Sequence, residues 1–203
     1  MRSYTASLLL LSLLCAACSL SSATLQLPAV IDSHMVLQRN SPATIWGWTD
    51  QPAGTNIGVT VASSTGSVAS YSATSQADGS WSVALGNASL TDFTETFTIS
   101  ITDGEDKKVL EDVMFGDVIL CSGQSNMELT VFGAFNNASE IQDSANYPYL
   151  RMFTTEKIAS LNPLPNLTSK VQQYNWSVSG PEAFLENGAG AWSVFSATCY
   201  FSQ

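Results

Sequence analysis

Histidine and basic residues are scarce in this sequence. One histidine and 7 lysine or arginine residues stand against 17 acidic residues, so the formal net charge is −10. This acidity argues against nucleic acid and anionic membranes as partners, because both repel negative charge. No cluster of histidine and cysteine, no carboxylate run of calcium-loop spacing and no glycine-rich phosphate or dinucleotide motif is present. We therefore expect neither a metal nor a cofactor.

The sequence also lacks a hydrophobic run long enough to cross a bilayer. Its longest apolar segment near the amino terminus, residues 8–14, is too short for a membrane anchor. The basic Arg2 precedes this segment, and residues 21–23 (Ser-Ser-Ala) form a small-x-small cleavage site. We interpret residues 1–23 as a signal peptide of an exported protein without a stable membrane anchor. A lipoprotein cut before Cys18 is the alternative, although the preceding residues fit a lipobox poorly.

Cysteine is limited to 4 residues, and two of them lie in the expected signal peptide. Cys121 and Cys199 remain, and they could form a disulfide in an oxidising compartment. Each also lies in a segment predicted to be buried, where a cysteine behaves as a small apolar residue. We favour two unpaired buried thiols.

Four Asn-x-Ser/Thr sequons follow the expected signal peptide. In an exported protein such sequons mark surface positions that carry N-linked glycans. The asparagines are Asn87, Asn137, Asn166 and Asn175. They indicate a compartment, and say nothing about activity.

Short alternating segments fill the sequence from residue 24 to about residue 110. Apolar residues alternate with polar or small ones, and turn-forming residues separate the segments. Regular short strands without a convincing helix predict a β-sandwich or jelly-roll-like module over residues 24–110. Trp46, Trp48 and Trp81 could form a platform for a sugar, but their alternation favours packing in the core. The predicted strands are Ala43–Trp48, Asn56–Ala62, Val68–Thr74, Trp81–Leu85 and Glu95–Ile101.

Strand-like and helix-like segments alternate after Glu111. Residues 118–121 form an apolar run suited to a buried strand of a parallel sheet. Residues 138–145 predict a helix, residues 149–153 another strand, and residues 192–201 a final helix. This alternation predicts the opening of an α/β layer over residues 111–203. The final helical pattern has no cap or terminating glycine, which favours an incomplete domain.

The apolar run leads directly into Ser122-Gly123-Gln124-Ser125. A serine between the carboxyl end of a strand and the start of a helix presents its hydroxyl near free backbone N–H groups. That geometry suits a nucleophile with donors for an oxyanion beside it. Turns of this composition are common, however, so the tetrapeptide alone does not establish catalysis.

Three ordered blocks resemble the sialate O-acetylesterase family, within the SGNH hydrolases. The blocks are Gly116–Met127, His34–Arg39 followed by Ile45–Trp48, and Phe195–Phe201. The resemblance implies a carboxylic-ester hydrolase in which Ser125 attacks an acetyl ester and its backbone N–H stabilises the oxyanion. It also implies a three-layer α/β hydrolase domain, of which residues 111–203 would form the incomplete first part.

The resemblance extends to supporting residues, substrate and compartment. Gly123, Gln124 and Asn126 are expected to shape the turn around Ser125. The implied partner is an acetylated sugar or glycan, with O-acetylated sialic acid first and xylan or other acetylated glycans as alternatives. The acidic composition fits an anionic sugar poorly. The implied location is secreted or lysosomal, and the oligomeric state is not indicated.

A general base for Ser125 is missing from the sequence. The base of the family is a histidine in an Asp-x-x-His motif, and no such motif occurs here. The single histidine, His34, belongs to the β module and is interpreted as structural, while Asp117 lies at the far end of the predicted strand. Loss of the histidine of a serine triad costs on the order of 10⁶ in turnover. We expect this chain alone to be inactive or nearly so; the alternative is a non-catalytic secreted protein that binds carbohydrate or a partner.

Overall fold

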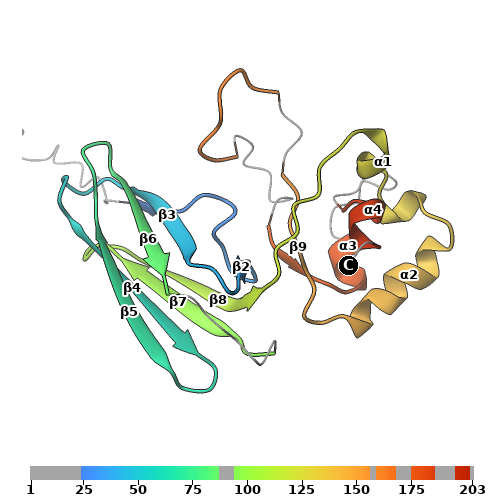
Figure 1. Ribbon diagram of the computed structural model, residues 1–203, viewed down its shortest axis with the longest axis horizontal. Helices are drawn as coiled ribbons and strands as arrows, with labels where there is room; N and C mark the ends of the chain where they lie inside the picture. The colour runs from blue at the N-terminus through green and yellow to red at the C-terminus, as the bar shows by residue number, and fades with distance from the viewer. Residues whose placement is uncertain (1–23, 87–93, 156–158, 168–174, 186–194, 202–203) are drawn as a thin grey trace, which may run out of the picture.

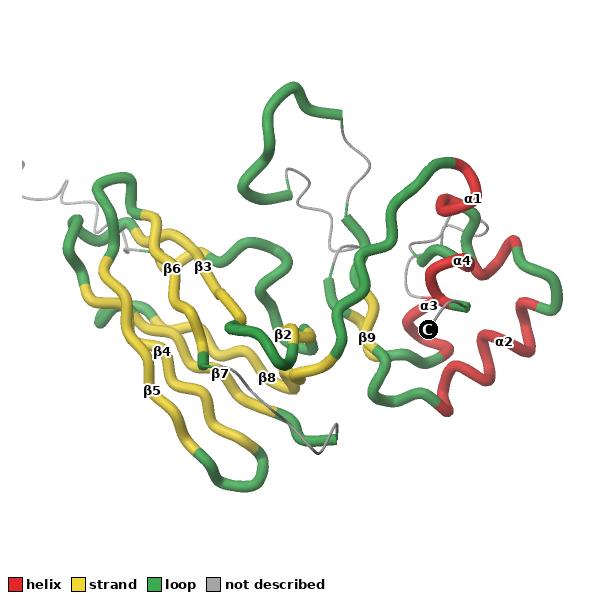
Figure 2. Tube along the Cα trace, viewed as in Figure 1, coloured by secondary structure: helices red, strands yellow, loops and turns green. Residues whose placement is uncertain are grey.

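The structure is a computed structural model that describes residues 24–86, 94–155, 159–167, 175–185 and 195–201. Strands fill the amino-terminal half of the chain, and short helices with irregular connections follow (Figures 1 and 2). The result is a mixed α/β fold that is rich in sheet. The finer assignments, a jelly roll and a three-layer hydrolase domain, stay predictions.

Two sheets form the amino-terminal half. The smaller sheet has the order β1-β3-β6 and is antiparallel. The larger sheet has the order β2-β8-β7-β4-β5, in which β2 and β8 are parallel and the other pairs are antiparallel. The bounds are β1 Leu25–Gln26, β2 Val36–Gln38, β3 Ala43–Thr49, β4 Asn56–Ser63, β5 Val68–Thr74, β6 Ser80–Leu85, β7 Phe97–Thr102 and β8 Lys107–Gly116.

One apolar core joins the two sheets. Alternate residues of β3, β4, β6 and β7 point into it, as a strand with one buried face requires. Ile45 and Trp81 come from the smaller sheet, and Ile57 and Ile99 from the larger one; all four are buried. The five predicted strands are confirmed, and so is the core position of Trp81. Trp46 and Trp48 are half-buried, and Trp46 packs against the same core.

Strand β8 is the longest strand and connects the two halves of the molecule. It runs without interruption through position 110, where the sequence indicates the end of the β module. The sheet therefore continues to Gly116, next to the segment that carries Ser125.

The second half contains short elements around a separate apolar cluster that includes Val131, Ile141, Phe184 and Phe195. The predicted helix over 138–145 is confirmed, and the predicted strand over 149–153 is reduced to two residues paired with β10. The elements are α1 Ser125–Glu128, η1 Val131–Gly133, α2 Asn137–Asp143, η2 Ser144–Asn146, β9 Arg151–Met152, β10 Ser177–Val178, α3 Pro181–Leu185 and α4 Ala197–Tyr200.

The prediction of a buried strand over residues 118–121 is wrong. This segment is irregular, and Val118, Ile119 and Leu120 are 47%, 56% and 91% exposed. A buried parallel strand needs a paired strand on each side. Among the described strands none pairs with this segment, because the ladder between β2 and β8 ends at Gly116.

Candidate functional site

The turn that carries Ser125 forms where the irregular segment enters α1. The carbonyl oxygen of Gln124 accepts hydrogen bonds from the N–H groups of Met127 at 2.8 Å and Glu128 at 3.1 Å. Gly123 makes this turn compact, since a Cβ at its position would lie 2.5 Å from Met127 Cγ. Backbone hydrogen bonds to Gln124 therefore close the turn, and the glycine before it leaves room for the Met127 side chain.

Ser125 is the first residue of α1, and its side chain is exposed. The helix was expected to begin directly after the serine, and it begins one residue earlier, at Ser125 itself. Its carbonyl oxygen accepts the Leu129 N–H at 3.1 Å, which is an ordinary helical bond. In the described part of the chain, neither the hydroxyl nor the N–H of Ser125 has a hydrogen-bond partner. An acyl group can therefore approach the hydroxyl with a backbone donor beside it.

The two residues that flank Ser125 act through their backbone. Gln124 forms no side-chain hydrogen bond to the helix start, so it holds the turn by its carbonyl group. The carbonyl oxygen of Asn126 accepts a hydrogen bond from the Thr198 hydroxyl at 2.9 Å. The turn is thus tied to α4, which lies 72 residues further along the chain.

Residues 195–201 pack against the far end of α1 as well. The Ala197 N–H donates to the Leu129 carbonyl oxygen at 2.8 Å, and Thr130 forms an antiparallel bridge with Ser196. The block that contains Ser125 and the block that contains α4 are therefore brought together by tertiary contacts, although they are far apart in sequence.

Cys121 and Cys199 form a disulfide, and the expectation of two unpaired buried thiols is wrong. That expectation placed Cys121 inside a buried strand. Cys121 instead lies in the irregular segment beside α4, where both cysteines are half-buried and their Cα atoms are 5.9 Å apart. This separation is one that a disulfide spans without backbone movement. The available indication in the sequence was the pair of cysteines that remains after the expected signal peptide.

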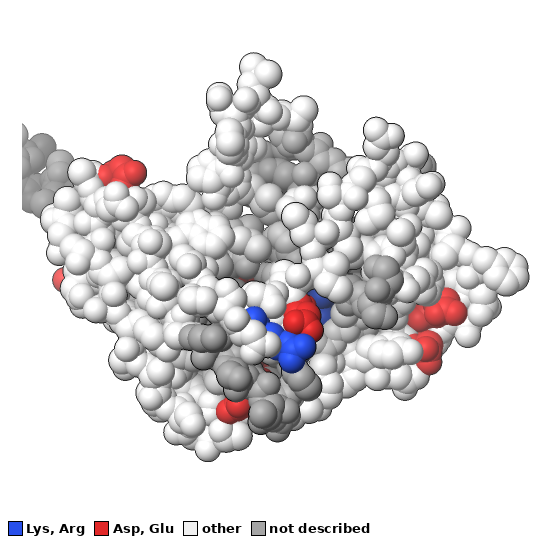
Figure 3. Space-filling view, in the orientation of Figure 1, with Lys and Arg blue, Asp and Glu red and all other residues white. Residues whose placement is uncertain are grey.

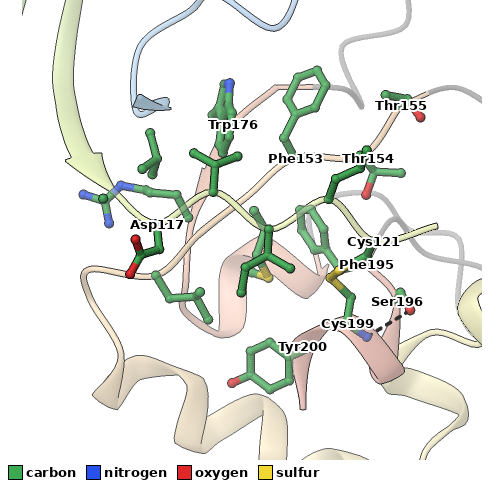
Figure 4. Close-up of a pocket in the computed structure, with 18 of the residues that line it drawn as sticks. Asp117, Cys121, Phe153, Thr154, Thr155, Trp176, Phe195, Ser196, Cys199 and Tyr200 are labelled. Carbon is green, nitrogen blue, oxygen red and sulfur yellow. Dashed lines mark hydrogen bonds between the residues drawn. A yellow bond between two sulfur atoms is a disulfide. The ribbon is translucent and has the colours of Figure 1, made fainter. Parts of the chain in front are cut away.

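A cavity of about 420 Å³ lies beside this disulfide. Phe153 and Trp176 pack together on one side of it, with ring centroids 5.3 Å apart, and Cys121 and Cys199 lie on another (Figure 4). Most of its lining is apolar, and the segment 117–121 forms part of its wall.

The cavity approaches α1 without including the serine. Met127 and Glu128 line it, whereas Ser125 does not. The arrangement supplies apolar surface within one helical turn of the candidate nucleophile. It does not by itself form a catalytic centre.

His34 lies in an ion cluster and not beside Ser125. Its Nδ1 is 2.8 Å from Asp112 Oδ2, and the same oxygen accepts a hydrogen bond from Arg151 at 2.9 Å. The Arg151 side chain is only 4% exposed. Within the described residues no hydrogen bond or ion pair joins His34 to residues 122–128. The geometry therefore agrees with a structural histidine and does not place His34 as the base of Ser125.

Asp117 forms an ion pair with Arg39. The Arg39 Nε and one terminal nitrogen donate to the two carboxylate oxygens of Asp117 at 2.9 and 2.7 Å. These hydrogen bonds lower the pKa of the Asp117 carboxyl and raise the pKa of Arg39. Figure 3 shows basic and acidic side chains gathered in the middle of the face in view, near the end of β8. A carboxylate held ionised in such a pair is a weak proton acceptor.

The sequons lie in different surroundings. Asn175 is exposed, and Asn166 is exposed with its Oδ1 accepting the Ala29 N–H at 2.9 Å. Asn137 is half-buried, and its side-chain amide donates to the Phe132 carbonyl oxygen. Asn87 lies outside the described residues. Glycosylation at all four positions stays a prediction.

The described ranges contain no group of three His, Cys, Asp or Glu side chains placed to hold a metal ion. No helix within them is both long enough and apolar enough to cross a bilayer.

Comparisons with known proteins identify relatives of the chain. No family model matches it. A sialate O-acetylesterase of Mus musculus is 33% identical over 182 residues, which cover 84% of this chain and 31% of the mouse protein. A sialate O-acetylesterase of Homo sapiens is 37% identical over 91 residues, which cover 45% of this chain and 16% of the human protein. The chain is therefore similar to one part of the length of proteins named sialate O-acetylesterase.

A solved structure extends the similarity to the fold. A carbohydrate acetylesterase from Xanthomonas citri matches with a TM-score of 0.67 and 25% identity, over 88% of this chain and 36% of that one. The resemblance predicted from the three sequence blocks is therefore confirmed. The chain spans about a third of the length of the mouse sialate O-acetylesterase.

Proposed function

We propose that this chain carries the nucleophile of an acetyl-ester hydrolase that acts on acetylated carbohydrates. The carrying observation is the exposed Ser125 at the first position of α1, with its hydroxyl open. Support comes from the similarity to sialate O-acetylesterases and to a carbohydrate acetylesterase. An activated serine at the start of a helix is a recurrent solution for acyl transfer.

The proposed chemistry proceeds through an acetyl-enzyme. Ser125 Oγ forms a bond to the acetyl carbonyl carbon and loses its proton to a base, while the Ser125 N–H stabilises the oxyanion. Collapse of this tetrahedral adduct breaks the bond to the sugar oxygen, which takes a proton and leaves as a hydroxyl, and the acetyl-enzyme remains. Water then attacks the acetyl group, and acetate is released with regeneration of the serine.

The base for this chemistry is proposed to lie outside these 203 residues. The only histidine is paired with Asp112, and the sequence contains no Asp-x-x-His motif. The base would belong to polypeptide that corresponds to the remaining two thirds of the relatives. This chain alone would then turn over acetyl esters on the order of 10⁶-fold more slowly than a complete triad.

The finer assignments are part of the same proposal. Residues 1–23 would be a signal peptide, residues 24–110 a β-sandwich or jelly-roll-like module, and residues 111–203 the first part of an SGNH-type layered domain. The substrate would be an O-acetylated sialic acid or a related acetylated glycan, in a secreted or lysosomal location. No partner nucleic acid or stable membrane anchor is proposed.

The test is an esterase fusion, defined as this chain joined to the part of mouse sialate O-acetylesterase beyond the matched region. Hydrolysis of O-acetylated sialic acid and of acetylated xylan is measured for a fusion that unfolds cooperatively. Ser125→Ala should lower kcat by at least about 10³-fold. Ser122→Ala, which changes an exposed serine of the same turn, should leave kcat within about two-fold.

Two outcomes would contradict this proposal. Equal activity of the Ser125→Ala and unchanged fusions would exclude Ser125 as the nucleophile. Rapid labelling of Ser125 by a fluorophosphonate in the 203-residue chain would show that the chain contains its own base.

The pairing of the only histidine with Asp112 favours a second candidate, a non-catalytic secreted protein that binds carbohydrate or a partner. Glycan binding by the β module in a fusion without esterase activity would support that candidate.

A further inference from the structure

Contact between β2 and the segment after β8 continues beyond the end of the strand ladder. The Arg39 N–H donates to the Gly116 carbonyl oxygen at 2.9 Å, and this is the last backbone bond between the two segments in the described chain. Side chains then replace the ladder. Gln38 Oε1 accepts the Val118 N–H at 2.9 Å, and Arg39 binds Asp117 through two hydrogen bonds.

Further hydrogen-bond geometry fixes the orientation of the Gln38 and Arg39 side chains toward residues 117 and 118. Gln38 Nε2 donates to the Arg39 carbonyl oxygen at 3.1 Å, which turns the amide oxygen toward Val118. The planar guanidinium of Arg39 meets both oxygens of Asp117, so the pair defines a direction as well as an attraction. Because Asp117 is 63% exposed, this ion pair should contribute little to global stability.

The next residues have no comparable anchor. Ile119 and Leu120 are mostly exposed, and among the described residues no hydrogen bond holds their backbone. The following fixed point is Cys121, which is joined to α4 by its disulfide. Only two residues therefore separate the anchored Val118 from the anchored Cys121, which limits the paths that the segment can take toward the turn with Ser125.

We propose that Gln38 and Arg39, acting through Val118 and Asp117, are positioning residues for the Ser125 nucleophile. This inference rests on the proposed esterase function and deepens it. It gives the amino-terminal block His34–Arg39 a part in the reaction, because two of its side chains set the path of the segment that ends at the serine.

The first measurement is hydrogen exchange in the 203-residue chain. Arg39→Met removes the guanidinium fork but keeps an apolar stem, and Gln38→Met removes the acceptor for Val118. Each variant should raise the exchange rate of the Val118 amide, the one that Gln38 binds, by at least about five-fold, the equivalent of one hydrogen bond, with the thermal midpoint nearly unchanged. Lys108→Met is the matched control, since it removes a β8 cation that lies 3.8 Å from Asp106. Unchanged exchange of the Val118 amide would overturn the inference.

The second measurement is kinetic and uses the esterase fusion. A displacement of the serine by about 1 Å can cost on the order of 10² in rate, so Arg39→Met should lower kcat to that extent and leave KM within about two-fold. Arg39→Lys, which restores charge without the fork, should recover part of the loss. The double variant Arg39→Asp with Asp117→Arg should also recover part of it. An unchanged kcat, or a loss confined to KM, would overturn the inference.

The two measurements separate this inference from the proposed function. Faster exchange with unchanged kcat overturns the positioning role and leaves the esterase standing. Activity that survives Ser125→Ala overturns the esterase proposal and the catalytic role of the pair together, whatever the exchange result shows.

Discussion

Removal of the Cys121–Cys199 disulfide should destabilise the chain strongly. The bond closes a loop with a sequence separation of 78 residues and joins the segment before Ser125 to α4. The perturbation is the double variant Cys121→Ala with Cys199→Ala, which leaves no unpaired thiol. Both cysteines are half-buried, so replacement by alanine should remove little packing.

The magnitude follows from loop closure. A closed loop of this length lowers the entropy of the unfolded chain by an amount worth about 4.5 kcal/mol at 25 °C, and native disulfides deliver about 2–5 kcal/mol. With a urea m-value of about 2 kcal/mol/M, the unfolding midpoint should fall by about 1–2.5 M. Reduction of the wild-type protein should produce the same shift, and reduction of the double variant should produce none.

The assay is urea unfolding of residues 24–203, produced under oxidising conditions and monitored by circular dichroism. Thiol titration of the denatured, unreduced protein is the accompanying control and should find no free thiol. Two free thiols before reduction, or equal midpoints for oxidised and reduced wild type, would refute the reasoning.

Three further predictions concern the β-rich half. Ile99→Ala opens a cavity in the shared core and should lower the free energy of unfolding by about 2–5 kcal/mol, whereas Val68→Ala at an exposed position should change it by less than about 0.5 kcal/mol in urea titrations. Gly47→Ala places a Cβ 2.3 Å from a backbone carbonyl oxygen of β1, and differential scanning calorimetry should show a loss of about 1–3 kcal/mol or more. Burial raises the pKa of Asp103, but hydrogen bonds from the Thr49 hydroxyl and two backbone N–H groups outweigh it, so the pKa lies below its ordinary value. The stabilisation by this carboxylate is complete above the ordinary pKa of about 3.9 and is lost as the pH falls through the lowered one. Asp103→Asn should therefore be less stable at pH 6 and show a flatter stability profile between about pH 4 and 2; identical profiles would contradict this.

Five strands were predictable because each carries its own pattern. A strand with one face in a core alternates apolar and polar residues, and that pattern predicted β3, β4, β5, β6 and β7 to within two residues at each end. Strand β8 was missed, because Lys107, Lys108, Glu111 and Asp112 interrupt the alternation. Its buried residues occur mainly near its end, where Val113, Met114 and Phe115 follow one another.

The candidate site was predictable only in part. Small and polar residues after an apolar run predicted a helix that begins at Asn126, and the structure has it begin one residue earlier. The apolar run itself was read as a buried strand, and its exposure shows that hydrophobicity does not create a strand without neighbours to pair with. The links from Arg39 to Asp117 and from Cys121 to Cys199 join residues 78 positions apart. No local pattern indicates such pairs.

The sequence by itself determined the five alternating strands, the turn before α1 and the absence of an Asp-x-x-His motif. Each of these depends only on residue identity and short-range spacing. Only the tertiary structure decided which segments meet at that turn, which cysteines pair and which side chains form hydrogen bonds with His34 and Asp117. Those outcomes depend on how the sheets and the short helices pack, because a side chain finds its distant partner only after the backbone between them has folded.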